Sequence, residues 1–167
     1  GASGFIGGGL AEMLAGEGFE VTGVSRQGEG QVTGVSRWVK PAAVDLRGCD
    51  VVVNLAGSPI DQRWTEAKKK QFHESRVGVT RDIVERISDL PEGERPELLL
   101  NGSAVGIYGD RGDERLDEGS SRGTGYLADL CSQWEAAAAR AEELGVRVVM
   151  FRTGVGLGKG GQAFENL

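Results

Sequence analysis

The chain has 167 residues, 39% of them hydrophobic and 26% charged, which is typical of a globular protein with one sizeable core. A net charge of -6 argues against a nucleic-acid binder, and no apolar run approaches the roughly 20 residues of a membrane span. The single histidine, His73, makes a histidine metal site or a Ser-His-Asp triad improbable, so we expect no metal.

The predicted elements alternate between helices and strands. After an opening glycine-rich turn, residues 7–16 form a helix with apolar Leu10, Met13 and Leu14. Long helices are predicted over 65–88 and 125–144. Five apolar runs predict buried strands, at residues 19–24, 32–38, 50–55, 97–101 and 146–152. Such alternation predicts an α/β fold with a doubly wound parallel sheet.

The two long helices carry different signals. The first places Phe72, Val79, Ile83 and Ile87 on a helical period. The second is expected to start at a Thr124 cap and to stop at Gly145, as helices often end at glycine.

The letters VTGVSR occur twice, at Val21–Arg26 and Val32–Arg37. Two copies with a period of about 11 are too few for a repeat architecture. We interpret them as two neighbouring strands, with Ser25 and Arg26 as ligand-binding residues and Ser36 and Arg37 as surface of the sheet edge.

Both ends of the chain predict truncation. The glycine-rich turn has no strand before it, and GKGGQAFENL ends without a terminating signal. We therefore expect residues 1–167 to form a single Rossmann domain that is a fragment, lacking its first strand and its C-terminal region.

The opening turn has the spacing G-x-x-G-x-x-G, formed by Gly1, Gly4 and Gly7. Glycine at these positions allows a tight turn and a close approach of the backbone to a pyrophosphate. A helix that begins near Phe5 would direct its free N–H groups toward the phosphates. The alternative is a helix-entry loop without a ligand.

Four motifs in order, GASGFIG, VVVNLAG, SAVGIYG and FRTGVGLGKGG, resemble the extended short-chain dehydrogenase/reductase superfamily. With RWT, SRVGVT and LADLCSQWEAAA they are similar to its epimerase-like subfamily 39U, the "epimerase family proteins" of NAD(P)-dependent epimerase/dehydratase type. The resemblance implies a Rossmann fold and a nucleotide cofactor. The implied cofactor-binding residues are Gly1, Ser3, Gly4, Phe5, Ile6, Gly7, Ser25, Arg26, Leu55, Ala56, Gly57, Gln71 and Arg76.

The end of the second strand of a Rossmann unit indicates which nucleotide is bound. An acidic residue there favours NAD, whereas an arginine accommodates the 2′-phosphate of NADP. This chain has Ser25 and Arg26 and no acid, so we predict NADP(H). Arg76 replaces an asparagine of the superfamily's N-V-x-G-T pattern, where a cation could reach the cofactor or an anionic substrate.

The catalytic pattern of the superfamily is incomplete. Extended reductases use a Ser/Thr on a strand and Y-x-x-x-K on the next helix. Here Ser103 matches the first serine of the motif and Ala104 stands where the catalytic hydroxyl is expected. Counting from Tyr126, the lysine position holds Leu130. Ser103 and Tyr126 remain the catalytic candidates.

Two functions stay open. One is hydride transfer on an unidentified small carbonyl or alcohol substrate, nucleotide sugars included. The other is an NADP(H)-binding regulator or scaffold without turnover. In extended reductases the helix matching 125–144 often lies in a dimer interface, which leaves a homodimer and intrachain packing open. Cys49 and Cys131, outside any CxxC pair, favour reduced thiols and a cytoplasmic protein.

Overall fold

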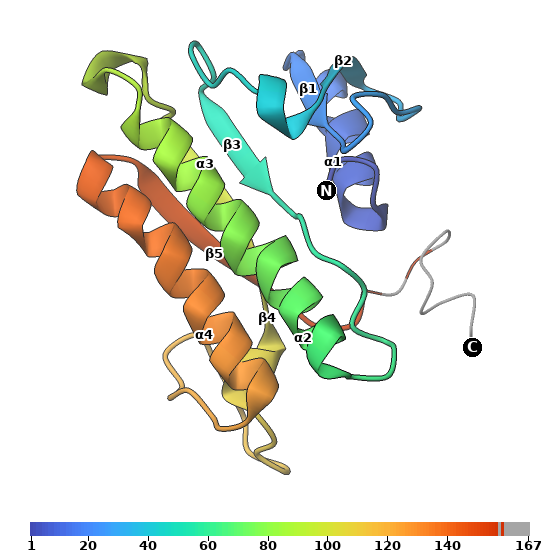
Figure 1. Cartoon of the computed structure of the whole chain (residues 1–167), viewed down its shortest axis with the longest axis vertical. Coiled ribbons are helices and arrows are strands. Elements are labelled where there is room, and N and C mark those ends of the chain that lie inside the picture. The colour runs from blue at the N-terminus through green and yellow to red at the C-terminus, as the bar shows by residue number, and fades with distance from the viewer. Residues whose placement is uncertain (157, 159–167) are drawn as a thin grey trace. The chain divides into compact units, whose positions relative to one another are not determined.

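Residues 1–156 and 158 are described by the computed structural model, in which the chain divides into two units. The first comprises Gly1–Asp45 and Gly156–Leu167, and the second comprises Leu46–Val155. Figure 1 identifies the elements by label and colour. In the described part of the chain no helix has the length and apolarity needed to cross a membrane.

The first unit contains helix α1 (Phe5–Gly16) and two parallel strands, β1 (Val21–Val24) and β2 (Val35–Val39), with a short 3-10 turn at Pro41–Ala43. The predicted helix and both strands are confirmed, and the helix begins at Phe5, as the glycine motif predicted. Gly34 has φ +87, and a side chain there would overlap the carbonyl oxygen of Ala11. Glycine therefore lets the segment before β2 touch α1.

The two VTGVSR copies fall at different points of their strands. In the first copy β1 ends at Val24, so Ser25 and Arg26 follow the strand. In the second, β2 begins only at Val35, so Ser36 and Arg37 lie inside it. Ser36 Oγ donates a hydrogen bond to the carbonyl oxygen of Val21 at 3.1 Å, and Arg37 is exposed. Ser36 and Arg37 of the second copy are therefore part of the sheet, as predicted.

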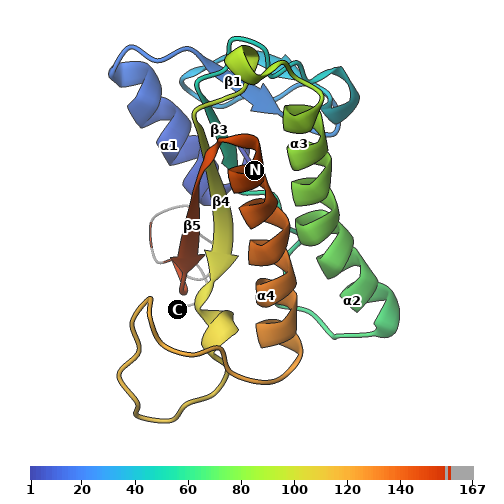
Figure 2. The same ribbon diagram turned by 90° about the vertical axis from the view of Figure 1, so that its left-hand side faces the viewer.

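The second unit has a parallel sheet in the order β3 (Val51–Asn54), β4 (Leu98–Ala104), β5 (Arg147–Thr153). Its helices are α2 (Glu66–His73), α3 (Val79–Ser88) and α4 (Tyr126–Ala139), which continues as a 3-10 turn over Arg140–Leu144. Shorter 3-10 turns lie at Glu92–Glu94 and Val105–Tyr108. Figure 2 shows α3 and α4 side by side along one face of the sheet.

The core of this unit lies between the sheet and these helices. One cluster joins Val84 and Ile87 of α3 to Leu99 of β4, together with Ala138, Ala141 and Val146. A second cluster comprises Phe72, Val77, Leu130, Trp134 and Ala137. The alanines of α4 are small and therefore allow α4 to pack closely against α3 and β4.

The long predicted helix is interrupted by a π-helical turn, Glu74–Gly78, between α2 and α3. A π-turn adds a residue to the helix and shifts the faces that follow it. Phe72 and Val77, five residues apart, are both fully buried, whereas the expected Val79 and Ile83 are only half-buried. The predicted helical period of buried residues was therefore wrong in the middle of residues 65–88.

The expected ends of the last helix had mixed outcomes. Gly145 adopts the left-handed conformation with φ 80, which confirms the predicted stop. The predicted Thr124 cap is wrong, because the N-cap residue is Gly125, with φ 99 and no side-chain hydrogen bond.

Candidate functional site

The glycine turn of the first unit is shaped by backbone contacts that exclude side chains. Gly4 N donates to the carbonyl oxygen of Gly1 at 3.0 Å. A Cβ on Gly7 would overlap that same carbonyl, and one on Gly4 would come within 3.2 Å of it. Glycine is therefore required at Gly7, as the motif predicts.

The start of α1 offers backbone donors. Gly4 is the N-cap, without a side-chain cap, and the first turn contains no acidic residue. The first N–H groups of such a helix lack partners within the helix, and the dipole favours an anion there. Ser3, Phe5 and Ile6 are exposed around this end.

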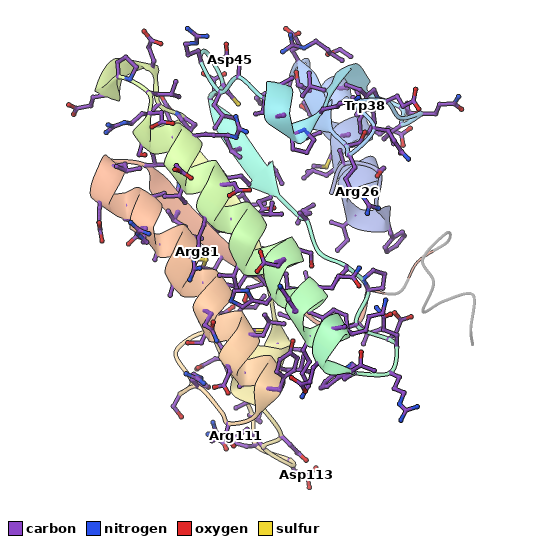
Figure 3. All side chains as sticks on the ribbon, in the orientation of Figure 1. Arg26, Trp38, Asp45, Arg81, Arg111 and Asp113 are labelled. Carbon is purple, nitrogen blue, oxygen red and sulfur yellow. The ribbon has the colours of Figure 1, made fainter. Side chains whose placement is uncertain are left out.

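Ser25 and Arg26 lie directly after β1. Ser25 Oγ accepts hydrogen bonds from Gly28 N at 3.0 Å and Glu29 N at 3.1 Å, and donates to Glu29 O at 2.7 Å. Its hydroxyl therefore closes the loop after the strand. Arg26, labelled in Figure 3, is exposed and forms no ion pair with any residue that the structure describes. This leaves its guanidinium available for an anion.

In the second unit the segment after β3 carries Leu55, Ala56 and Gly57. Ala56 N donates to Asn54 Oδ1 at 3.2 Å, which turns the chain at the strand end. A Cβ on Gly57 would lie 3.2 Å from the guanidinium of Arg76. The structure therefore brings two of the predicted residues, Gly57 and Arg76, into contact.

Arg76 lies in the middle of the π-turn. Its Nη2 donates to Ser58 O at 3.0 Å, and the guanidinium lies 5.5 Å from the ring centroid of Trp134. Burial lowers the pKa of Arg76, an effect partly offset by Cys131 and Tyr126. Gln71, predicted to share its face, is exposed and accepts a hydrogen bond from Lys68 Nζ at 3.2 Å.

A buried polar network supports the π-turn from behind. Thr80 Oγ1 donates to Arg76 O at 2.8 Å and accepts from Asn54 Nδ2 at 2.9 Å and Trp134 Nε1 at 3.0 Å. Asn54 Nδ2 also donates to Asn101 Oδ1 at 2.7 Å. Because the side chains of Thr80, Asn54, Asn101 and Trp134 are all buried and bonded, the network fixes the end of β3 and the middle of α4 against the π-turn.

Ser103, the first catalytic candidate, belongs to a different cluster. Ser103 Oγ donates to Glu135 Oε1 at 2.5 Å, and Arg152 forms a two-pronged pair with the same carboxylate at 2.8 and 2.9 Å. Arg152 also donates to the Tyr108 hydroxyl at 2.8 Å. Ser103 and Arg152 are register partners in β4 and β5.

The charges in this cluster stabilise each other. Burial would raise the pKa of Glu135, but the hydrogen bonds from Arg152 and Ser103 outweigh it, so the pKa lies below its usual range. The Glu135 carboxylate in turn raises the pKa of Arg152. The Ser103 hydroxyl therefore donates its hydrogen bond to a carboxylate that stays ionised. Ser103 is only 2% exposed.

Tyr126, the second candidate, lies outside both networks. Its hydroxyl donates to the carbonyl oxygen of Lys69 at 3.1 Å, and its ring packs against Trp64 with centroids 5.5 Å apart. Desolvation raises its pKa, although Lys69 and Arg76 act in the opposite direction. An ordinary tyrosine is already a poor base at neutral pH, so this environment does not activate it. Leu130, at the expected lysine position, is buried.

Several residues of these networks were not predicted, namely Thr80, Asn101, Tyr108, Glu135 and Arg152. A signal existed for two of them: Glu135 is the one acid in an alanine-rich stretch, and Arg152 ends an apolar strand. A charge in such a run is expected to have a buried partner. Thr80 stands at the threonine of the N-V-x-G-T pattern, but its burial depends on the π-turn, which the sequence did not predict.

The remaining groups suggest surface or packing roles. Figure 3 shows Arg111 and Asp113 at the tip of the loop between β4 and α4, where Arg111 pairs with Glu114 at 2.6 Å. Cys49 and Cys131 are free thiols. Among the described residues no three His, Cys, Asp or Glu side chains are grouped as a metal site would require.

The whole arrangement has known counterparts. The model of the NAD dependent epimerase/dehydratase family matches residues 1–166. Human epimerase family protein SDR39U1 is 37% identical over the full chain, and its homologue in Arabidopsis thaliana, described as chloroplastic, is 43% identical over 71% of the chain. The chain spans 56% and 34% of these two proteins.

Solved structures show the same fold. The crystal structure of human SDR39U1 (isoform 2) with NADPH superposes with a TM-score of 0.81 at 32% identity, over 99% of this chain and 55% of that one. A nucleoside-diphosphate sugar epimerase from Corynebacterium glutamicum gives a TM-score of 0.75 at 36% identity, over 93% and 32% of the two chains. The fold is thus Rossmann-like, as predicted. The chain belongs to the NAD dependent epimerase/dehydratase family, where it groups with the SDR39U1 epimerase family proteins.

Proposed function

We propose that this chain binds NADP(H) and forms part of an oxidoreductase or epimerase-type enzyme that transfers hydride to or from a small carbonyl or alcohol substrate. The observation that carries the proposal is the tight glycine turn before α1, followed at the end of β1 by an arginine without a partner among the described residues. The NADPH in the human relative supports the same choice of nucleotide.

The residues present fit the diphosphate of such a cofactor. Gly4 and Gly7 let the turn pack tightly against the backbone of Gly1, and the uncapped N-terminus of α1 supplies N–H donors. Arg26 fits the 2′-phosphate, because its guanidinium can form a two-pronged charged hydrogen bond. We further propose that Leu55, Ala56 and Gly57 contact the cofactor, as the resemblance implies. Ser25 holds the loop that carries Arg26.

The test of nucleotide choice uses the two sequence copies as variant and control. Arg26→Ala is expected to weaken NADPH binding by about 1.5–3 kcal/mol, the size of a lost charged hydrogen bond, and NADH binding far less. Arg37→Ala, the same change in the second copy, should leave both affinities unaltered. Dissociation constants from titration calorimetry decide it, and equal losses for NADPH and NADH in Arg26→Ala would contradict the assignment.

The chemistry of turnover is divided between cofactor and protein. When bound, a nicotinamide supplies or accepts the hydride. We propose that Ser103 accepts a hydrogen bond from a substrate hydroxyl, because the Ser103 hydroxyl proton is already used in the hydrogen bond to Glu135. Tyr126 remains a candidate donor, since a raised pKa keeps its hydroxyl protonated.

A second function, an NADP(H)-binding regulator without turnover, is favoured by three observations. Ala104 provides no hydroxyl, Leu130 provides no cation, and Ser103 is almost fully buried. A panel of carbonyl compounds with NADPH separates the two functions. Oxidation of NADPH by any member supports the enzyme, whereas tight NADPH binding without oxidation across the panel supports the regulator.

We also propose a homodimer and a cytoplasmic location. A groove is lined by residues of α3, α4 and the 3-10 turn that follows α4, including Arg81, Val84, Ala137 and Arg140. Apolar residues and charges of both signs in one patch suit a self-complementary two-fold contact. Sedimentation of the purified protein tests it, and a monomer at high concentration would contradict the dimer.

A further inference from the structure

The loop that follows β1, residues 25–30, is held by hydrogen bonds to itself and to β2. Ser25 closes it, because its hydroxyl bonds to the backbone of Gly28 and Glu29. Ser25 N also donates to Val39 O of the neighbouring strand at 3.1 Å. The start of the loop is therefore tied to the end of β2.

Side chains at the end of β2 pack directly on this loop. Gly28 has φ +76, and a Cβ there would lie 2.8 Å from Cγ of Lys40 and 3.5 Å from its Cε. A Cβ on Gly30 would lie 2.5 Å from the ring of Trp38. Glycine at both positions therefore lets the two side chains touch the loop backbone. Lys40, the first residue after β2, runs its stem along Gly28.

The loop and the residue after β2 carry two cations without counter-charges. Arg26 and Lys40 are both exposed, and neither forms an ion pair with a residue that the structure describes. Glu29 is the one acid of the loop, and within the described part of the chain its carboxylate pairs with neither cation. The two positive charges therefore suit an anion that carries more than one negative charge.

Both cations lie at the edge of the sheet where an α/β fold binds its ligand. β1 and β2 are parallel, and their last paired residues are Val24 and Val39. Arg26 and Lys40 follow these two residues, so both lie at the carboxyl ends of the strands. Ligands of open α/β sheets bind outside that edge. Because the Lys40 stem is packed against Gly28, its ammonium is restricted to the neighbourhood of the loop that carries Arg26.

We propose that Lys40 is a second cation for the 2′-phosphate of NADP(H), acting together with Arg26. The inference rests on the proposed function, and it adds a residue to which the family resemblance assigns no cofactor contact. A phosphate monoester carries about 1.5 to 2 negative charges at neutral pH, more than one guanidinium neutralises. Arginine binds phosphate through its planar fork, whereas lysine contributes a compact point charge. Together the two side chains balance the charge of the phosphate.

The test compares two nucleotides that differ only in the 2′-phosphate. Lys40→Met keeps an unbranched stem on Gly28 but removes the charge. It should weaken NADPH binding about tenfold, the loss expected for one charged hydrogen bond, and NADH binding by less than about twofold. Lys40→Gln should behave alike, whereas Lys40→Arg keeps the charge and should retain most of the NADPH affinity. Titration calorimetry measures the dissociation constants. Native NADPH affinity in both uncharged variants, or equal losses for NADPH and NADH, overturns the proposal.

Adenosine monophosphates separate the phosphate from the rest of the cofactor. Lys40→Met should weaken the binding of 2′-AMP, followed by NMR titration, and leave the binding of 5′-AMP unaltered. Arg37→Met removes a charge from an exposed site inside β2 and is the matched control, with native affinity for both dinucleotides and both monophosphates. Equal losses of 2′-AMP and 5′-AMP in Lys40→Met would mean that Lys40 only shapes the loop, which overturns the proposal.

The Arg26 variant keeps this inference separate from the proposed function. If Arg26→Ala loses NADPH affinity selectively while Lys40→Met binds NADPH as the native protein does, the proposed function stands and only the assignment of Lys40 fails. If the native protein binds NADPH no more tightly than NADH, the choice of nucleotide fails and the assignment of Lys40 fails with it. In the double variant the preference for NADPH should vanish, and a preference that remained would overturn the proposal by placing the phosphate on other residues.

Discussion

Two half-buried arginines in the second unit, Arg152 and Arg76, meet opposite environments. Arg152 has a carboxylate partner at 2.8 Å, a tyrosine hydroxyl and the carbonyl oxygen of Glu118. Arg76 has neutral oxygens, two of them at 3.5 Å, and the Trp134 ring, 5.5 Å from its guanidinium to the ring centroid. The pKa of Arg152 is raised by its partner, whereas burial lowers that of Arg76. The same side chain is thus a stabilising clamp in one place and an energetic cost in the other.

The different partners of Arg152 and Arg76 indicate which of the two arginines stabilises the fold of this unit. The Arg152 pair joins β4, β5 and α4, so its partners are positions that the fold must hold together. Arg76 forms no ion pair among the described residues, so we expect its charge to contribute less to stability than that of Arg152. Changes at the two positions should therefore alter the free energy of unfolding with opposite sign.

The largest expected effect comes from breaking the clamp. Arg152→Ala leaves the carboxylate of Glu135 largely buried without its partner, which should lower the free energy of unfolding by about 3 kcal/mol. Urea unfolding measures it. Arg111→Ala, which breaks the more exposed pair with Glu114, is the control and should cost less than about 1 kcal/mol. Similar losses in both variants would mean that Arg152 is no clamp.

The next effect concerns the network behind Arg76. Thr80→Val preserves shape but leaves the donors of Asn54 and Trp134 without their shared acceptor, which should cost about 2 kcal/mol. The variant should also release Arg76 O, which accepts from the same hydroxyl. Thr80→Ser keeps the hydroxyl and is the matched control. Native stability in Thr80→Val would show that the shared hydroxyl contributes nothing to the network.

The buried polar networks could not be predicted from the sequence, whereas most of the fold could. The strands, the helices and the required glycines at Gly7 and Gly145 followed from apolar runs and local spacing. Such signals are local, so a single sequence carries them. The pairing of Glu135 with Arg152 and of Thr80 with Trp134 depends on residues 17 and 54 positions apart, which only the folded sheet brings together. The π-turn also shifted the buried face, so Val77 and Thr80 replaced Val79 as inner residues.

The sign of the effect at Arg76 is the sharpest test of the comparison. Arg76→Met replaces a partly desolvated cation by an apolar side chain of similar length, which should raise the free energy of unfolding by about 1 kcal/mol. Arg152→Met, the same change at the clamp, should instead be destabilising. A loss of stability in Arg76→Met would mean that its contact with Ser58 outweighs its desolvation.

The smallest effect is a pH dependence from Glu135. Its pKa is lower in the folded than in the unfolded protein, because Arg152 and Ser103 stabilise the ionised form. This contribution is complete above the unfolded pKa, about 4.3 for glutamate, and is lost as the pH falls through the folded value. Glu135→Gln lacks the ionisable group, so the stability difference between native protein and variant should be constant near neutral pH and shrink below about pH 4. Urea unfolding at a series of pH values measures that difference, and one that stayed constant into acid would place the folded pKa of Glu135 at its ordinary value, with Arg152 adding nothing to its charge.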